Sequence, residues 1–428
     1  MFFLFYFALM IRTLLITIAA NLLLGSSVFA QTDSVPKAFY TTKENREMEW
    51  LSLVRSIKEN LSLKLSDDTE PNWQEAFDAM ELIYYRSALA DAKIRSAFAS
   101  LEKRSPGFQR NFLELIYTNY PKEFVSQVLA FAQQTQEPKL FAMCAEYLLM
   151  NNKRAAYGTL LRNRMSEILK RMEPNADIPF FTILRSKILI GSPKTPPVQD
   201  LTSNNFLPNE IVLYSFQRKN RNYPGLAMVR TKDGTFIKDE NGKYFAVPQL
   251  ARSITNMPGY ITNGNTPQGI FKMFGFGVSK GAAIGPTTNI QMVLPYEKST
   301  DVAASVTQSL GDNYMNLVPE SWRSYYPFFE AWYAGKTGRT EIIAHGTTVN
   351  PEYYKNKTYY PQTPTQGCLC TKESWSAVDG KRTKSDQQKL VNALKSAGGA
   401  DGYCVVIEID DQQKPVSLQD VLPFLGQK

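Results

Sequence analysis

The sequence is poor in the two residue types that most often hold metals or crosslink chains. Its 428 residues include one histidine, His345, and four cysteines. Four cysteines are too few for the disulfide-dense scaffold of small secreted proteins. A structural zinc site is not expected, because one C-x-C pair and one histidine lack the paired ligand spacing of such sites. The cysteines are Cys144, Cys368, Cys370 and Cys404.

Two further absences narrow the class of partner and of fold. No basic-aromatic motif of the kind that binds nucleic acid is present, so we expect no nucleic-acid partner. No repeat of fixed period is strong enough to indicate a named solenoid. The net charge of +8 at pH 7 suits an anionic partner such as a cell-wall polymer, although a soluble surface explains it equally well. An apolar content of 43% and a charged content of 21% are typical of a globular protein.

The first 30 residues have the pattern of a secretory signal peptide. Residues 1–24 are almost wholly apolar and are interrupted by Arg12. Residues 28–30 (VFA) place small side chains at the two positions that a signal peptidase reads, which predicts cleavage before Gln31. No cysteine lies at this site, so a lipoprotein is not expected. The sequence predicts export to the periplasm or cell envelope, with a retained membrane anchor as the alternative, because residues 1–24 are long enough to span a bilayer.

Residues 31–190 predict an all-α domain. Trp73, Phe77, Met80 and Tyr84 recur at helical spacing. A further helix is predicted to start at Pro121 and to bury Phe124, Val128 and Phe131. The remaining predicted helices cover residues 86–103, 107–119, 139–150 and 154–172. We expect a bundle or short stack of helical hairpins, and a protein partner that binds through this domain is one open role for it.

Residues 191–209 contain four prolines and predict a linker, after which the sequence predicts mainly strands. Asp233-Gly234 and Asn241-Gly242 are hairpin signals. A helix is predicted over residues 385–397. Strands are predicted at residues 211–216, 226–230, 235–237, 244–247, 271–276, 290–294, 341–344 and 404–409. The fold class expected is α+β, with an all-α domain followed by a β-rich sandwich or barrel-like domain at residues 210–428.

The single histidine and a glycine-flanked cysteine lie on one loop-bearing segment. His345 ends a predicted strand, and Cys368 ends the polar loop that follows it. A thiol is mostly protonated near neutral pH, and a neighbouring imidazole activates it by accepting its proton. Gly367 would let the backbone pass close to a substrate carbonyl, and amides near Cys368 would stabilise an oxyanion. The alternative is a chance histidine and an inert, buried cysteine.

Three segments of the chain occur in the order of a known family. They are residues 265–272 (NTPQGIFK), 345–347 (HGT) and 365–370 (TQGCLC). With them, the region from about 210 to 410 resembles the catalytic domain of the YkuD-type L,D-transpeptidases. Two positions depart from the family pattern. Gln366 replaces the motif histidine, and Cys370 stands where the family usually has arginine or asparagine.

The resemblance implies a mechanism and a set of site residues. Cys368 would be the nucleophile, His345 the base, and the carbonyl of Gly346 the third member of the site. The substrate would be a peptidoglycan stem peptide, which is cut before its terminal D-alanine and joined through a thioester to a neighbouring stem as a 3→3 crosslink. No cofactor is implied. Expected substrate-binding residues are Thr365, Gln366, Gly367, Tyr359, Tyr360 and Lys372.

Several alternatives remain open at the level of sequence. The loop with Tyr353, Tyr354, Tyr359 and Tyr360 is interpreted as a lid, or else as a solvated surface loop. Lys372 is a candidate substitute for the missing arginine. The same residues suit an L,D-carboxypeptidase or another peptidoglycan hydrolase, a cysteine protease of protein substrates, or a degenerate domain that only binds cell wall. Nothing in the sequence indicates an oligomeric state.

Overall fold

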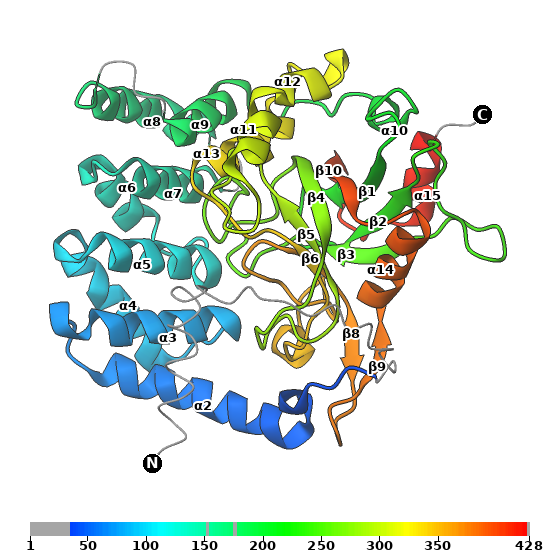
Figure 1. Ribbon diagram of the computed structural model, residues 1–428. Helices are drawn as coiled ribbons and strands as arrows, with labels where there is room; N and C mark the ends of the chain where they lie inside the picture. Colours follow the sequence, from blue (N-terminus) through cyan, green and yellow to red (C-terminus); the bar gives the residue numbers. More distant parts are fainter. Residues whose placement is uncertain (1–34, 151–153, 174–177, 426–428) are drawn as a thin grey trace. The chain divides into compact units, whose positions relative to one another are not determined.

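The computed structural model describes residues 35–150, 154–173 and 178–425. The signal peptide or anchor predicted for residues 1–30 lies outside this range. Within it, no helix combines the length and the apolar character needed to cross a membrane. Residues Pro36–Lys428 belong to one compact unit, in which a helical part precedes a β-barrel part (Figure 1).

The helical part is a stack of antiparallel hairpins, which confirms an N-terminal helical region. Prolines occupy the first turn of α3, α5, α7 and α9, where a missing N–H is tolerated because the first-turn N–H groups have no partner within the helix. Buried aromatic side chains join neighbouring helices, as in the edge-to-face contact of Phe77 with Phe112. The helices are α2 (Lys43–Ser62), α3 (Glu70–Leu82), α4 (Ala88–Ala97), α5 (Pro106–Asn119), α6 (Val125–Gln134), α7 (Pro138–Leu149), α8 (Arg154–Leu169) and α9 (Pro179–Ile190).

The helix predicted to start at Pro121 begins later than expected. Pro121 lies in a turn, and α6 starts at Val125. The turn is held by a bond from the N–H of Glu123 to the carbonyl of Tyr120, and the N–H of Phe124 donates to the hydroxyl of Tyr147 at 3.1 Å. These tertiary contacts stabilise a non-helical connection where proline alone suggested a helix start.

The β part is a closed barrel, as the barrel-like expectation foresaw. Its order is β1-β10-β4-β5-β6-β7-β3-β2, with β1 parallel to β10 and β6 parallel to β7. A separate two-stranded sheet pairs β8 (Glu373–Trp375) with β9 (Arg382–Ser385). The barrel strands are β1 (Ile211–Arg218), β2 (Gly225–Arg230), β3 (Val247–Leu250), β4 (Gly269–Gly277), β5 (Asn289–Val293), β6 (Ala344–His345), β7 (Leu369–Thr371) and β10 (Asp401–Asp410).

Alternate residues of the strands enter two different apolar clusters. Leu213 of β1 packs in the cluster that also contains Leu390 and Leu394 of α14 (Asp386–Ser396). Its neighbour Tyr214 packs in the cluster that contains Phe206 and Trp322. Because side chains alternate along a strand, burial on both faces explains why β1 reads as a continuous apolar run.

Several local predictions were wrong in their detail. Residues 235–237 and 244–247 do not form a regular ladder beyond single bridges such as Arg230 with Phe236, and only Val247 belongs to a strand. The strand predicted at residues 341–344 shrinks to β6, because Glu341 has a φ of 60° that interrupts the extended backbone. The sequence also did not predict α11 (Ala304–Asp312), α12 (Tyr314–Leu317) and α13 (Glu330–Lys336).

The segment predicted as a linker packs against strands β1 and β2 of the barrel. It contains α10 (Gln199–Thr202), and Leu201, Phe206 and Leu207 are buried against β1 and β2. The guanidinium of Arg230 donates to the carbonyls of Ser203, Phe206 and Leu207. The segment with four prolines forms only a short helix, but it is packed against the barrel.

The hydrophobic core of the helical part extends into one loop of the barrel part. The segment between β3 and β4 sends Met257, Tyr260 and Ile261 into the helical core, where they are 0%, 1% and 0% exposed. We name residues 257–268 the foundation loop. Polar contacts from α5 and α7 also reach it: Asn263 Nδ2 to Glu114 Oε2 at 3.2 Å, Lys139 Nζ to Thr262 Oγ1 at 2.8 Å, and Tyr260 OH to Glu146 Oε1 at 2.6 Å. The predicted boundary at residues 191–209 therefore does not separate independent domains.

Candidate active site

The parallel pairing of β6 with β7 brings the segment with His345 beside the segment with Cys368. Ala344 lies opposite Leu369, and His345 lies opposite Cys370. Ala344 and Leu369 belong to the barrel core, so His345 and Cys370 face the other way. Cys368 directly precedes β7, and its Sγ lies against the carbonyl of Glu341.

His345 is held as a neutral base. Its side chain is 3% exposed, and its Nδ1 contacts the carbonyl oxygen of Gly346. A carbonyl oxygen only accepts, so Nδ1 carries the proton and Nε2 keeps its lone pair. Burial lowers the pKa of His345 to about 4, and the bond to Gly346 opposes this only in part. The structure thus pairs the His345 ring with the Gly346 carbonyl.

The Glu373 carboxylate packs against Gly346. A Cβ atom at Gly346 would overlap Glu373 Oε2, so a larger residue does not fit here. Glu373 is 7% exposed and accepts from the N–H of Thr347 at 3.1 Å and from Thr287 Oγ1 at 2.7 Å. The sequence did not reveal this support, because no spacing rule connects Glu373 to the histidine motif.

Cys368 is half-buried and rests as a thiol. Its Sγ donates to the carbonyl of Glu341 at 3.5 Å, and the structure shows no hydrogen bond from Sγ to the His345 ring. Burial raises the pKa of Cys368 to about 11, against which the N–H of Ile343 and the Arg339 guanidinium act to lower it. The two reacting groups are therefore both neutral at rest. Catalytic hydrogen bonds are often formed only when substrate binds.

The turn before Cys368 is tightly held. Gly367 has a φ of 126°, and a Cβ there would overlap Arg339 Nη2. Its carbonyl accepts from Thr266 Oγ1 at 2.9 Å, and its N–H donates to Thr365 Oγ1 at 3.0 Å. The N–H of Gly367 is thus occupied, as is that of Leu369, which donates to the Ile343 carbonyl at 3.0 Å. Among the described residues of this turn, the N–H groups of Gln366 and Cys368 have no hydrogen-bond partner and are available to an oxyanion.

The other residues expected to bind substrate are dispersed. Thr365 supports the turn, because its Oγ1 also donates to the carbonyl of Cys368 at 3.0 Å. Gln366 is exposed beside it. Lys372 is exposed beyond β7, where its carbonyl accepts from the N–H of Asp386. The Gln366 and Lys372 side chains are thus both open to solvent.

The tyrosine-rich loop is packed against the helical part, which corrects its interpretation as a lid. Tyr354 and Tyr359 are 0% and 1% exposed, so Tyr359 presents no surface to a substrate. The hydroxyl of Tyr359 donates to that of Tyr84 at 3.3 Å, and the guanidinium of Arg252 lies 4.8 Å from the Tyr359 ring centre. Tyr360 is 39% exposed and donates to Glu352 at 2.9 Å.

A residue that the sequence analysis missed lies next to the thiol. Arg339 is 3% exposed and donates to the carbonyls of Gly259, Gly264 and Asn265, the last two at 3.1 and 2.8 Å. These acceptors are backbone atoms of the foundation loop, far away in the sequence. Backbone acceptors leave no mark in a sequence, so no motif could have identified Arg339.

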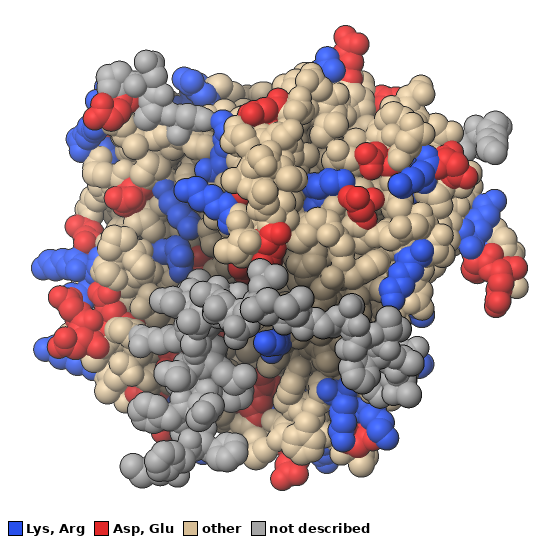
Figure 2. Space-filling view, in the orientation of Figure 1, with Lys and Arg blue, Asp and Glu red and all other residues tan. Residues whose placement is uncertain are grey.

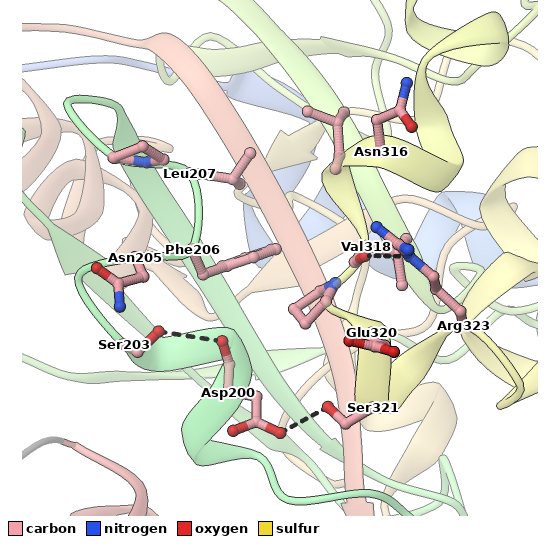
Figure 3. Close-up of a pocket in the computed structure, with 13 residues that line it drawn as sticks. Asp200, Ser203, Asn205, Phe206, Leu207, Asn316, Val318, Glu320, Ser321 and Arg323 are labelled. Atoms are coloured by element: carbon pink, nitrogen blue, oxygen red, sulfur yellow. Dashed lines mark hydrogen bonds between the residues drawn. The ribbon is translucent and has the colours of Figure 1, made fainter.

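A separate open groove of about 760 Å³ lies away from these residues. Its walls come from the α10 region and from residues 316–323 (Figure 3), and neither His345 nor Cys368 lines it. Within it, Ser321 donates to Asp200 at 2.6 Å. Neither a cysteine nor a histidine lines this groove, so it is separate from the candidate pair of His345 and Cys368.

The candidate active site thus consists of a neutral imidazole and a thiol on two paired segments of the barrel, beside a buried guanidinium. Comparisons of the chain with protein-family models, with curated proteins and with solved structures gave no match. The chemistry of the site must therefore be inferred from its own geometry.

Proposed function

We propose that the protein is an exported L,D-transpeptidase that acts on peptidoglycan stem peptides through a Cys368 thioester. The observation that carries this proposal is the contact of His345 Nδ1 with the Gly346 carbonyl, on a strand that pairs with the strand directly after Cys368. That contact leaves Nε2 as a proton acceptor toward the thiol. The stem-peptide substrate comes from the resemblance of residues 265–272, 345–347 and 365–370 to the family.

The acylation step follows from the resting neutral pair. Cys368 Sγ attacks the carbonyl carbon before the terminal D-alanine while its proton moves to His345 Nε2. The N–H of Cys368 donates to the developing oxyanion. The carbon–nitrogen bond then breaks, His345 returns the proton to the leaving D-alanine amine, and a thioester remains. No metal or redox step is needed.

The second half of the cycle regenerates the thiol. The side-chain amine of a neighbouring stem attacks the thioester, His345 accepts a proton from that amine, and Cys368 leaves as the protonated thiol. The product is a 3→3 crosslink. Water in place of the amine gives a tripeptide, so an L,D-carboxypeptidase uses the same atoms.

The described residues on one face of the molecule form no continuous basic patch (Figure 2). On the face shown in Figure 2, basic and acidic side chains are interspersed. The net charge of +8 is thus not gathered there into a basic surface for an anionic polymer. A helical part that also binds a protein partner remains compatible with this proposal.

Mass spectrometry of muropeptides tests the proposal. Purified protein is incubated with tetrapeptide monomers, and a 3→3 dimer is expected, whereas a tripeptide indicates the carboxypeptidase. Cys368→Ala should lower turnover by about 10³-fold or more, because loss of a nucleophile removes the covalent route. Cys370→Ala is the matched control, since Cys370 lies opposite His345 but is 1% exposed. Unchanged muropeptides with the wild-type protein, or full turnover by Cys368→Ala, would contradict the proposal.

A further inference from the structure

Arg339 is a buried cation without a paired carboxylate in the residues that the structure covers. The salt bridges found there involve other arginines, such as Arg218 with Asp410 and Asp420. The partners of Arg339 are the neutral carbonyls of the foundation loop. Removing a charge from water costs several kcal/mol, and neutral acceptors repay this only in part. A buried guanidinium that stays charged without an ion pair is therefore a candidate for a functional role.

The guanidinium is fixed against the turn that carries the thiol. It occupies the space that a Cβ of Gly367 would need, so Gly367 and the peptide leading to Cys368 lie directly upon it. The foundation loop beneath is held from the other side by Glu330, which accepts from the N–H of Gly259 at 2.8 Å and from that of Gln268 at 3.1 Å. These contacts hold the Arg339 guanidinium in place against the turn that carries Cys368.

The arginine remains charged at working pH. Burial lowers the pKa of Arg339 to about 10, while Glu330 and Cys368 oppose this change. In the same way, the guanidinium lowers the pKa of Cys368, against the larger effect of burial. The two groups are thus electrostatically linked at a partly buried position, where charges interact more strongly than in water.

We propose that Arg339 is a positioning residue that holds a positive charge beside Cys368 and stabilises the anion formed as its proton leaves. This inference rests on the proposed function. In the acylation step, negative charge passes from Sγ to the substrate carbonyl oxygen as the proton goes to His345 Nε2. Arg339 supplies a fixed countercharge throughout, without a bond to either reacting atom.

The pH profile of Cys368 alkylation tests this role. Iodoacetamide reacts with the thiolate, and peptide mass spectrometry reports Cys368 separately from the buried cysteines Cys144, Cys370 and Cys404. Arg339→Gln should raise the pKa of Cys368 by at least one unit, so alkylation below that pKa falls at least about tenfold. Arg339→Lys keeps the charge and should restore most of the rate. A folded Arg339→Gln protein with the wild-type profile would overturn the proposal.

Two controls separate this role from folding and from the overall function. Circular dichroism reports whether each variant folds. If Arg339→Gln fails to fold, Arg339→Lys decides: a Cys368 profile close to wild type supports the role of charge, and a rise of a full pKa unit in a folded protein contradicts it. Alkylation needs no wall substrate, so its outcome is independent of whether the protein acts on peptidoglycan.

Discussion

At the scale of single residues, His345 can be observed without interference, because it is the chain's only imidazole. Its ring signals in an NMR spectrum need no assignment among other histidines. We expect them to titrate with a pKa near 4 and to show the tautomer protonated at Nδ1. A pKa near the ordinary value of 6.5 would contradict the buried neutral base.

The same shift predicts how stability depends on pH. The folded pKa of about 4 lies below the ordinary 6.5, so protons bind the unfolded chain more readily. His345 contributes fully to stability above pH 6.5, and the contribution of about 3 kcal/mol is lost as pH falls through 4. Urea unfolding of the wild type should lose about this much more stability across the window than His345→Gln. Equal losses in the two proteins would refute the shift.

The candidate site was only partly predictable from sequence. His345 and Gly346 form one short motif, and Gly367 and Cys368 form another. These four residues could therefore be proposed from the sequence. Arg339 could not, because its acceptors are carbonyl oxygens of a loop more than seventy positions away. Burial also decides what a tyrosine does: nothing local distinguishes the buried Tyr359 from the exposed Tyr360.

At the scale of elements, the foundation loop connects the helical core to the thiol. Ile261→Ala should destabilise the protein by about 2–4 kcal/mol, because it leaves a cavity in the core. It should also change the rate of Cys368 alkylation, since Arg339 and Gly367 rest on the same loop. Denaturant unfolding and iodoacetamide labelling measure the two effects.

A matched control is available in α4. Ile94 is also 0% exposed in the helical core, but it does not belong to the foundation loop. Ile94→Ala should lower the free energy of unfolding by a similar amount and leave Cys368 labelling unchanged under native conditions. Equal labelling in both variants would show that the loop does not transmit its packing to the thiol.

Elements with a strong local pattern were predicted well. Helices from α3 to α7 follow apolar spacing, and α3, α5 and α7 have a proline in the first turn. β1 and β10 follow their apolar runs. β6 was predicted with other bounds and β7 was not predicted, because two or three residues cannot display a period and are extended only through their neighbours. The two strands that carry the candidate site are thus the ones with the weakest sequence pattern.

At the scale of the whole molecule, the two parts should unfold together. A fragment of residues 210–428 exposes Met257, Tyr260 and Ile261, which are otherwise buried by helices. We expect this fragment to be aggregated or only partly folded, whereas residues 31–428 should unfold in one cooperative transition. Size-exclusion chromatography and thermal unfolding compare the two. A monomeric fragment with its own sharp transition would contradict a core that extends from the helical part into the barrel part.

The inserted foundation loop also has a consequence for how such a chain can be rearranged by recombination. A crossover at the proline-rich residues 191–209 would join a foreign helical part to a barrel whose Ile261 and Tyr260 fit only the original helices. Such a hybrid inherits the histidine and the cysteine intact but loses the support beneath Arg339. We therefore expect the helical part and the barrel to be inherited together. Substitutions in α5 or α7 should be accompanied by substitutions in the foundation loop.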